Sequence, residues 1–136
     1  MSFAINTDEF PLVLIEYPRQ ASLEEIDAYI ESLAGILARG RICTIVDIRN
    51  VSVVAGKTST TAKHRKHLAT RLDEITLGHP NRIVSEAIIF DSTVMRGLYT
   101  AFSWLRKDKS YASRAFKSIK EARAWTNSQV VKAGLS

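Results

Sequence analysis

Charged and hydroxyl side chains follow two predicted strands of this sequence, at the points where those strands end. Asp47 and Arg49 close one apolar run, Ile42–Ile48, and Asp91 follows another, Arg82–Phe90. In a parallel α/β sheet, ligands gather at the carboxyl ends of the strands. We therefore predict a surface there that binds an anionic ligand or a partner, formed by Asp47, Arg49, Lys57, Thr58, Ser59, Asp91, Ser92 and Arg96.

The same residues also fit an interpretation that involves no ligand. Ser92 stands where a helix is expected to begin, so its hydroxyl can cap that helix. Asp47 can form an ion pair with Arg49. Lys57 precedes a predicted helix, whose first N–H groups favour anions. The sequence leaves the two interpretations open.

The sequence gives little support to catalysis. A catalytic metal needs two or three converging ligands, and His64 and His67 have no third ligand at suitable spacing, with His79 and Cys43 elsewhere. The G-x-S-x-G motif of a nucleophile elbow does not occur, and residues 51–58 lack the first glycine of a phosphate-binding loop. We therefore predict no catalytic residue, no metal site, no cofactor and no enzymatic activity.

The composition is typical of one globular domain. The chain has 136 residues, of which 46% are hydrophobic and 24% are charged, and these values are ordinary for a packed domain. No apolar run approaches the roughly 18 residues of a membrane span, and the first residues do not have the pattern of a secretory signal. From the length and composition we predict one domain over residues 1–136. Cys43 is the single cysteine and cannot form a disulfide within the chain, so we predict a cytoplasmic location.

Charge is unevenly distributed along the chain. Residues 1–50 contain four basic and eight acidic residues, whereas residues 51–136 contain fifteen basic and six acidic ones. A basic half attracts nucleic acid, anionic lipid or an acidic partner. The densest basic stretch, Lys63–His67, has no aromatic residue and matches no nucleic-acid motif. We therefore do not expect a nucleic-acid partner.

The hydrophobic pattern predicts strands and helices in alternation. Strands are expected at Phe3–Thr7, Leu12–Tyr17, Ile42–Ile48, Arg82–Phe90 and Ala112–Phe116, and helices at Ser22–Arg39, Thr60–Ile75, Thr93–Arg106 and from Ser118 onward. The first helix has a capping box in Ser22 and Glu25. The order ββαβαβαβα predicts an α/β fold, with a mixed, largely parallel sheet of four to five strands and about four helices.

The predicted helix Thr93–Arg106 is apolar around most of its circumference. Such a helix is expected to be buried on more than one side. Either the sheet and its neighbours cover it, or part of it meets a partner or an apolar ligand. We assign three of its residues to the core: Leu98, Ala101 and Leu105. A self-complementary apolar face most often forms a two-fold dimer, so we predict a homodimer interface at Tyr99, Phe102 and Trp104.

Three motifs connect these elements to a known family. The first is D-x-R after a strand (Asp47, Arg49), the second is S-x-x-x-R-G before an aromatic helix (Ser92, Arg96), and the third is F-x-S-x-x-E-A-x-x-W (Phe116–Trp125). With them the sequence resembles the small stand-alone proteins of the STAS group (sulphate transporter and anti-sigma factor antagonist), which are grouped with the lipid-binding Sec14 fold. The resemblance covers nearly the whole chain and implies a mixed sheet with helices packed on it.

The resemblance also implies a mode of action. STAS proteins dock a partner kinase or regulator, and phosphorylation of a serine or threonine in the loop after the Asp-containing strand switches that docking. This loop lacks the D-S-S-G motif of the family, and its hydroxyls are Ser52, Thr58, Ser59 and Thr60. The Sec14 side of the resemblance implies an apolar ligand instead.

Together these observations predict a non-catalytic signalling or interaction module. It is expected to dock a regulatory protein at residues 49–60 and the following helix, with phosphorylation as a means of control. The first alternative is a protein that binds a small anion or a lipid through Arg49, Lys57 and Arg96. The second is an enzyme with a site that no known motif marks.

Overall fold

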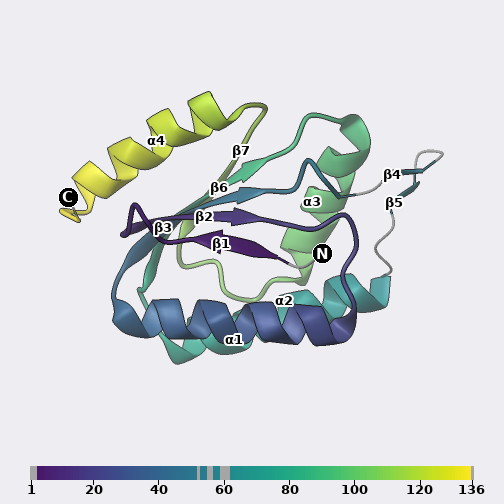
Figure 1. The fold of residues 1–136 in the computed structure, drawn as a ribbon, viewed down its shortest axis with the longest axis horizontal. Coiled ribbons are helices and arrows are strands. Elements are labelled where there is room, and N and C mark those ends of the chain that lie inside the picture. Colours follow the sequence, from purple (N-terminus) through teal and green to yellow (C-terminus); the bar gives the residue numbers. More distant parts are fainter. Residues whose placement is uncertain (1–2, 52, 55–56, 59–61, 136) are drawn as a thin grey trace.

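The computed structural model describes residues 3–51, 53–54, 57–58 and 62–135. Its main sheet contains β1 (Ala4–Asn6), β2 (Leu12–Glu16), β3 (Ile42–Asp47), β6 (Ile83–Ile89) and β7 (Ala112–Phe116). These strands lie in the order β1-β2-β3-β6-β7 (Figure 1). β1 runs antiparallel to β2, and the other neighbouring pairs are parallel. The predicted mixed, largely parallel sheet is confirmed.

The parallel strands end at a common edge of the sheet. Glu16 is in register with Asp47, Asp47 with Ile89, and Ile89 with Phe116. The residues that follow β3 and β6 therefore leave the sheet side by side. β3 is buried along nearly its whole length, as the β-branched composition of a strand covered on both faces predicts.

A small antiparallel sheet follows β3. β4 (Val53–Val54) pairs with β5 (Lys57–Thr58). Figure 1 shows the two strands beyond the edge at which the parallel strands end. The sequence predicts only a polar loop in this region, because strands of two residues are too short to produce a hydrophobic period.

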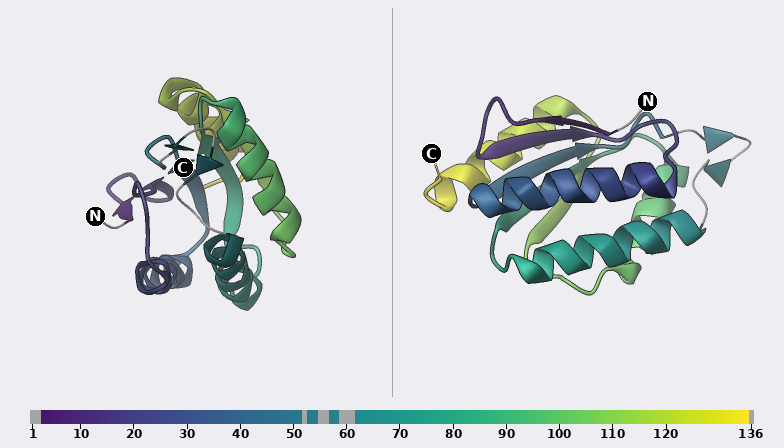
Figure 2. Two further views of the ribbon diagram at one scale, coloured as in Figure 1. Left: turned by 90° about the vertical axis from the view of Figure 1, so that its right-hand side faces the viewer. Right: turned by 60° about the horizontal axis from the view of Figure 1, so that its bottom comes forward.

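Helices cover both faces of the main sheet. α1 (Leu23–Arg39) and α2 (Ala62–Gly78) lie on one face, and α4 (Ile119–Lys132) lies on the other (Figure 2). α3 (Thr93–Leu105) lies next to α2 and packs its buried side into the same core as α1. All four helices occur where the sequence predicts them, and α2 continues to Gly78.

Serine caps define the start of three helices. The Ser22 hydroxyl accepts a hydrogen bond from the Glu25 N–H at 3.1 Å, and the Glu25 carboxylate accepts one from the Ser22 N–H at 3.1 Å, which completes the predicted capping box. The Ser92 hydroxyl accepts from the Met95 N–H at 3.1 Å. Ser118 caps α4 in the same way. Each cap satisfies an N–H group that the helix itself leaves without a partner.

The core consists of two clusters, one on each face of the sheet. The larger cluster lies under α1, α2 and α3 and includes Ile30 and Leu37 of α1 and Val46 of β3. The smaller cluster lies under α4, where Ala122 packs on Ile45 and its neighbours. Alternation along the strands directs successive side chains to opposite faces, which is why β3 contributes to both clusters.

Within this chain, α3 is not buried on more than one side. Among its residues only Met95 is buried, although Leu98 packs against the larger cluster. Ala101 and Leu105 were assigned to the core but are exposed, Leu105 by 42%. α3 lies at the margin of the helix layer, next to α2 (Figure 2), so its outer side has no neighbour within the described chain. Its apolar residues on that side therefore face solvent.

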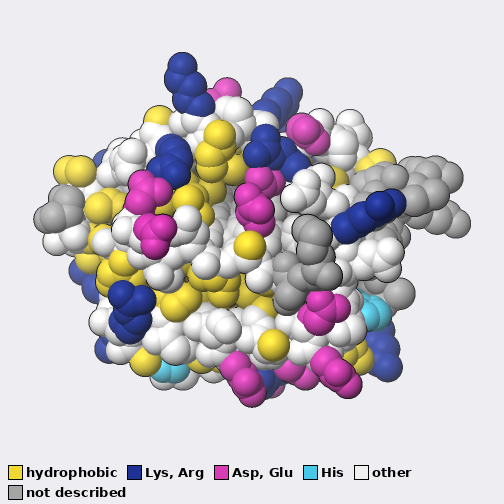
Figure 3. All heavy atoms as spheres, viewed as in Figure 1, with side chains coloured by type: hydrophobic (Ala, Val, Ile, Leu, Met, Phe, Trp, Pro, Cys, Tyr) yellow, Lys and Arg dark blue, Asp and Glu magenta, His cyan; other side chains and the backbone are white. Residues whose placement is uncertain are grey.

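The charges of the sequence separate on the surface. In the view of Figure 3, carboxylates gather along the lower edge, over α1, and basic side chains are more frequent over α4. This separation follows from the acidic first third of the chain and its basic remainder. None of the helices in the described ranges has the length and apolarity that crossing a membrane would require.

Candidate functional site

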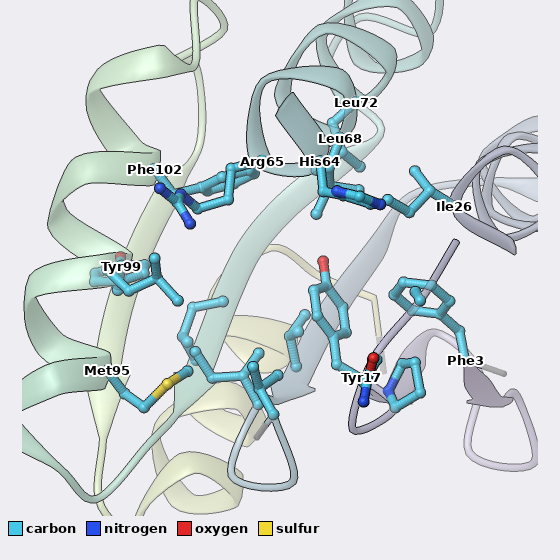
Figure 4. A pocket seen from close by; sticks show the side chains of 18 of the residues that line it. Phe3, Tyr17, Ile26, His64, Arg65, Leu68, Leu72, Met95, Tyr99 and Phe102 are labelled. Carbon is cyan, nitrogen blue, oxygen red and sulfur yellow. The ribbon is translucent and has the colours of Figure 1, made fainter. Parts of the chain in front are cut away.

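A pocket of about 120 Å³ lies between the main sheet and the helices α1, α2 and α3 (Figure 4). Its walls are mostly apolar because β3 and β6 direct their inward side chains toward it, while each helix contributes part of its buried stripe. The apolar lining residues are Phe3, Pro18, Ala21, Ile26, Val46, Ile48, Val51, Leu68, Leu72, Ile88, Met95, Leu98 and Phe102. The pocket therefore suits an apolar occupant.

Glu86 of β6 places a carboxyl group in this apolar wall. It is in register with Thr44 of β3 on one side and with Ser113 of β7 on the other. Glu86 Oε1 accepts a hydrogen bond from the Ser113 hydroxyl at 3.0 Å, and the Tyr99 hydroxyl lies 2.7 Å from Ser113 Oγ. Because a serine hydroxyl has one hydrogen to donate, Tyr99 donates to Ser113 when Ser113 donates to Glu86.

Burial raises the pKa of Glu86 above the ordinary value of a glutamate. The positive charge of Arg106 and the hydrogen bond from Ser113 act in the opposite direction but do not cancel the effect of burial. The second carboxyl oxygen, Oε2, has no hydrogen-bond partner among the residues that the structure describes. A carboxyl group with a raised pKa that lines a pocket marks a candidate ligand site.

Aromatic side chains form the opposite side of the pocket. The ring of Phe3 stacks on Tyr29 with 4.3 Å between centroids, and Tyr17 meets Phe3 edge-on at 4.8 Å. Burial raises the pKa of both phenols, so they are neutral at physiological pH. Figure 4 shows the Tyr17 hydroxyl pointing toward α2. Tyr17, which lines the pocket, thus adds a hydrogen-bonding group without adding charge.

A second cavity, of about 270 Å³, adjoins the first and is more polar. The two cavities share Glu86, Tyr99 and Phe102. The polar cavity is completed by Ser103, Arg106, Asp108, Lys109, Tyr111 and Ser113. Glu86 therefore lies at the junction between an apolar space and a polar one.

A buried ion pair supports the wall of the polar cavity. Arg106 Nε donates to Asp73 Oδ1 at 2.8 Å, and both side chains are more than 90% buried. Asp73 also accepts from the backbone N–H groups of Lys107 and Asp108, at 2.9 and 3.0 Å. Burial acts to raise the pKa of Asp73, but the hydrogen bonds from Arg106 and the two amides outweigh it and lower that pKa. Asp73 is therefore a carboxylate near neutral pH and fixes the chain after α3 against α2.

The structure brings part of the predicted strand-edge surface together. Arg49 binds Asp47 through two side-chain hydrogen bonds, Nε to Oδ1 at 3.0 Å and Nη2 to Oδ2 at 2.7 Å. These bonds, followed by the charges of Asp91 and Glu16, raise the pKa of Arg49. Asp47, Arg49 and Asp91 therefore share one edge of the sheet. The charge of Arg49 is already matched by a carboxylate, which weakens its attraction for an anion.

The remaining residues predicted for this surface have other surroundings. The Ser92 hydroxyl caps α3, and the guanidinium of Arg96 lies 5.8 Å from the centre of the Phe90 ring. Lys57 and Thr58 form β5. Ser52, Ser59 and Thr60, the other predicted phosphorylation positions, lie outside the described residues.

The histidines and the cysteine are separated in space. His64 lines the apolar pocket, whereas His67 Nε2 lies 2.7 Å from Asp27 Oδ1 of α1. His79 bonds to the carbonyl of Ile75, and Cys43 is buried. In the described ranges, no three His, Cys, Asp or Glu residues converge as metal ligands would.

The residues predicted for a homodimer interface divide between two environments. Tyr99 and Phe102 are half-buried and line both cavities. Trp104 is 76% exposed on the outer side of α3.

Sequence reasoning missed Glu86, Asp73 and Arg106. The signal for Glu86 was a single charged residue inside the apolar strand Ile83–Ile89, on the same face as Ile88. A charge at such a position is rare without a partner or a function. Asp73 and Arg106 are 33 residues apart and lie in segments rich in other charges, so the sequence offers no comparable signal for their pairing.

Comparison with known proteins identifies the fold. No protein-family model matches the sequence, and no curated protein matches it. A solved structure does match: an uncharacterised protein of the DUF3478 family from Shewanella loihica PV-4, which has a SpoIIAA-like fold. The TM-score is 0.62 at 16% sequence identity, over 92% of this chain and 94% of that one. Since identity this low is informative about the fold alone, we conclude that this chain has a SpoIIAA-like fold, in agreement with the resemblance of its sequence.

Proposed function

We propose that this protein is a non-catalytic binding module whose apolar pocket holds a small organic molecule. The observation that carries the proposal is the pocket between the sheet and α1, α2 and α3, with Glu86 in its wall. Ligand sites are typically concave and apolar, with a few polar groups that orient the ligand. The Sec14 side of the sequence resemblance agrees with an apolar ligand.

The size of the pocket limits the ligand. A dry protein cavity of about 150 Å³ binds one benzene molecule, and this pocket measures about 120 Å³. The pocket itself therefore fits a single ring or a short branched chain. A ligand with more atoms would extend into the adjoining polar cavity, past Glu86, Tyr99 and Phe102.

The arrangement of polar groups favours binding over catalysis. General acid–base chemistry usually employs two groups with different proton affinities on opposite sides of a substrate. Here the hydroxyls of Tyr99 and Ser113 form one hydrogen-bonded chain that ends at Glu86. The chain orients a single carboxyl group, as a recognition site requires.

Toluene is a suitable first probe, because it is ring-sized and has no polar group. We expect saturable binding by isothermal titration calorimetry, and chemical-shift changes confined to residues around the pocket. Replacing half-buried Leu98 with tryptophan fills the pocket and should abolish binding. Leu77→Trp makes the same change at a position that is 60% exposed on α2 and should leave binding unchanged. Equal affinity in wild type and Leu98→Trp, or no saturable binding by wild type, would contradict the proposal.

Docking of a regulatory protein at residues 49–60 is a second candidate function. It is favoured by the β4–β5 sheet, which lies beyond the main sheet (Figure 1) and follows the Asp47–Arg49 pair in the chain, and it agrees with the sequence resemblance to STAS proteins. Arg49→Glu should then weaken capture of a specific partner from lysate, whereas Lys120→Glu on exposed α4 should not. Phosphatase treatment tests control through Ser52, Thr58, Ser59 or Thr60. Equal capture by both variants would exclude Arg49 from the docking surface.

A further inference from the structure

We infer that the ligand of the pocket is an amine: a ring-sized apolar body with a protonated amino group that donates a hydrogen bond to Glu86. This inference rests on the proposed function and adds the chemical class of the ligand. It depends on two observations, the hydrogen bonding of Glu86 and the number of charges in the buried region around it.

The Glu86 carboxyl group is incompletely satisfied. Its Oε1 accepts from Ser113, but Oε2 has no partner among the described residues. No ion pair in the described chain includes Glu86. A carboxylate in an apolar wall is costly unless it is paired and hydrogen-bonded. A donor on the ligand would supply the missing partner.

The nearest buried cation is already occupied. The guanidinium of Arg106 binds Asp73 at 2.8 Å and Tyr111 at 2.8 Å, and its Nη2 lies 3.4 Å from the Thr76 hydroxyl. Arg106 thus matches the charge of Asp73 and directs its hydrogen bonds toward α2 and Tyr111. Two carboxyl groups, Asp73 and Glu86, share one guanidinium. Among the described side chains that are buried, Arg106 is thus the one cation beside two acids.

The other titratable groups around Glu86 do not supply that charge. Burial raises the pKa of four tyrosines and the charge of Glu86 helps to raise it, so these tyrosines are neutral near pH 7: Tyr17, Tyr29, Tyr99 and Tyr111. His64 and Arg65 of α2 line the apolar pocket, but both have interactions of their own with other residues. Neither is among the charges that shift the pKa of Glu86. An ammonium group on the ligand would pair with Glu86 without displacing an existing contact.

The two cavities explain how an amine would be oriented. Its ring would occupy the apolar pocket, and its nitrogen would reach Glu86 at the junction with the polar cavity. A charge-assisted hydrogen bond contributes about 1.5–3 kcal/mol, which corresponds to a gain in affinity of roughly tenfold or more. The pocket should therefore prefer an amine over a neutral molecule with the same ring.

Benzylamine, toluene and benzoate test this inference, because they share one ring and differ in charge. At pH 7, calorimetry on wild type should show benzylamine binding about tenfold or more tightly than toluene, with benzoate weakest. Glu86→Gln should reduce the preference for benzylamine over toluene to less than about threefold. Glu74→Gln, the same change at an exposed position on α2, should behave as wild type.

A measurement on wild type guards against poor folding of Glu86→Gln. The side-chain carboxyl carbon of Glu86, observed by NMR, should shift on addition of benzylamine and not on addition of toluene. Toluene binding without a preference for benzylamine would overturn the amine inference and leave the proposed function in place. A preference for benzoate would also overturn it and would assign recognition to Arg65. Failure of all three probes to bind would overturn the inference together with the proposed function.

Discussion

Replacing Asp73 with alanine removes a buried carboxylate that three donors share. Arg106 Nε, the Lys107 N–H and the Asp108 N–H lie 2.8, 2.9 and 3.0 Å from its oxygens. After the substitution the two amides lose their acceptor. The guanidinium keeps only the Tyr111 hydroxyl and the more distant Thr76 hydroxyl. The buried guanidinium then loses the carboxylate that is hydrogen-bonded to it.

The expected cost follows from these contacts. Three hydrogen bonds at about 1 kcal/mol each amount to about 3 kcal/mol, and breaking a buried ion pair by removing one partner costs about 3–5 kcal/mol. Because Tyr111 continues to solvate Arg106, we expect the lower end, a loss of about 3 kcal/mol in the free energy of unfolding. For a chain of this length that loss lowers Tm by roughly 10 °C.

Urea unfolding followed by circular dichroism at pH 7 measures this loss. Glu74→Ala is the matched control, since Glu74 is the next residue of α2 and its 2.8 Å pair with Arg71 is exposed. Exposed pairs contribute about 0–1 kcal/mol. A double variant, Asp73→Leu with Arg106→Met, should lose less than the two single changes together, because it leaves no unpaired charge. A cost for Asp73→Ala below about 1 kcal/mol, or equal to that of Glu74→Ala, would refute the reasoning.

The contribution of Asp73 also has a predictable pH dependence. Its pKa is lower in the folded protein than in the unfolded chain, where an aspartate has a pKa of about 3.9. The stabilisation is therefore present above about pH 4 and is lost as the pH falls through the folded-state pKa. The difference in stability between wild type and Asp73→Ala should shrink at acidic pH.

Three other substitutions test separate parts of the structure. Burial raises the pKa of Glu86, so the contribution of Glu86 to the free energy of unfolding is fully present below about pH 4.3 and is lost as the pH rises through its folded-state pKa. Thermal melts should therefore show Glu86→Gln gaining stability relative to wild type between pH 4 and pH 8. The opposite trend would contradict the burial of Glu86. Trp104, 76% exposed on α3, should mediate the predicted homodimer: sedimentation at high micromolar concentration should give a dimer for wild type and a monomer for Trp104→Ala, and a monomeric wild type would exclude the interface. Trp125 is half-buried, 5.6 Å from the Phe116 ring, so Trp125→Ala should cost about 3 kcal/mol in urea unfolding, and a loss below about 1 kcal/mol would show that this contact contributes little.

The fold could be predicted where local signals agree with tertiary packing. The capping box of Ser22 and Glu25 and the helical spacing of Ile26, Ile30 and Leu33 point to one helix with one buried face, and α1 has both. The apolar, β-branched sequence of β3 predicts a strand that is covered on both faces, and the helices of the fold do cover both. In these elements the residue pattern and the environment require the same structure.

Prediction was less successful for α3, because hydrophobicity shows what a helix can bury and not which neighbours it will have. Its apolar circumference implied burial on several sides, yet the fold packs one side of it against α2, β5 and the larger core cluster, and Ala101 and Leu105 remain exposed. Tyr99 and Phe102 were assigned to an interface between chains. They line cavities within this chain instead, although whether they also contact a second copy stays a prediction.

The candidate site shows a similar limit of sequence reasoning. The rule that ligands gather at strand ends brought attention to Asp47, Arg49 and Asp91, and these residues do share one edge of the sheet. The pocket, however, is built from side chains in the middle of strands that point under the helices. Strand-end reasoning could not find Glu86, since it lies three positions before the end of β6 at Ile89.

The position of Glu86 is itself an argument for function. Thr44, Glu86 and Ser113 form a row across three parallel strands, and this row interrupts a face whose other positions are largely apolar. Leucine or isoleucine at position 86 would avoid the cost of burying a carboxyl group. Proteins accept such local conflicts mainly at sites where the group has a task to perform. In this chain the carboxyl lies between two cavities, with one oxygen held by Ser113 and the other without a partner among the described residues, and ligand recognition is the task that accounts for both.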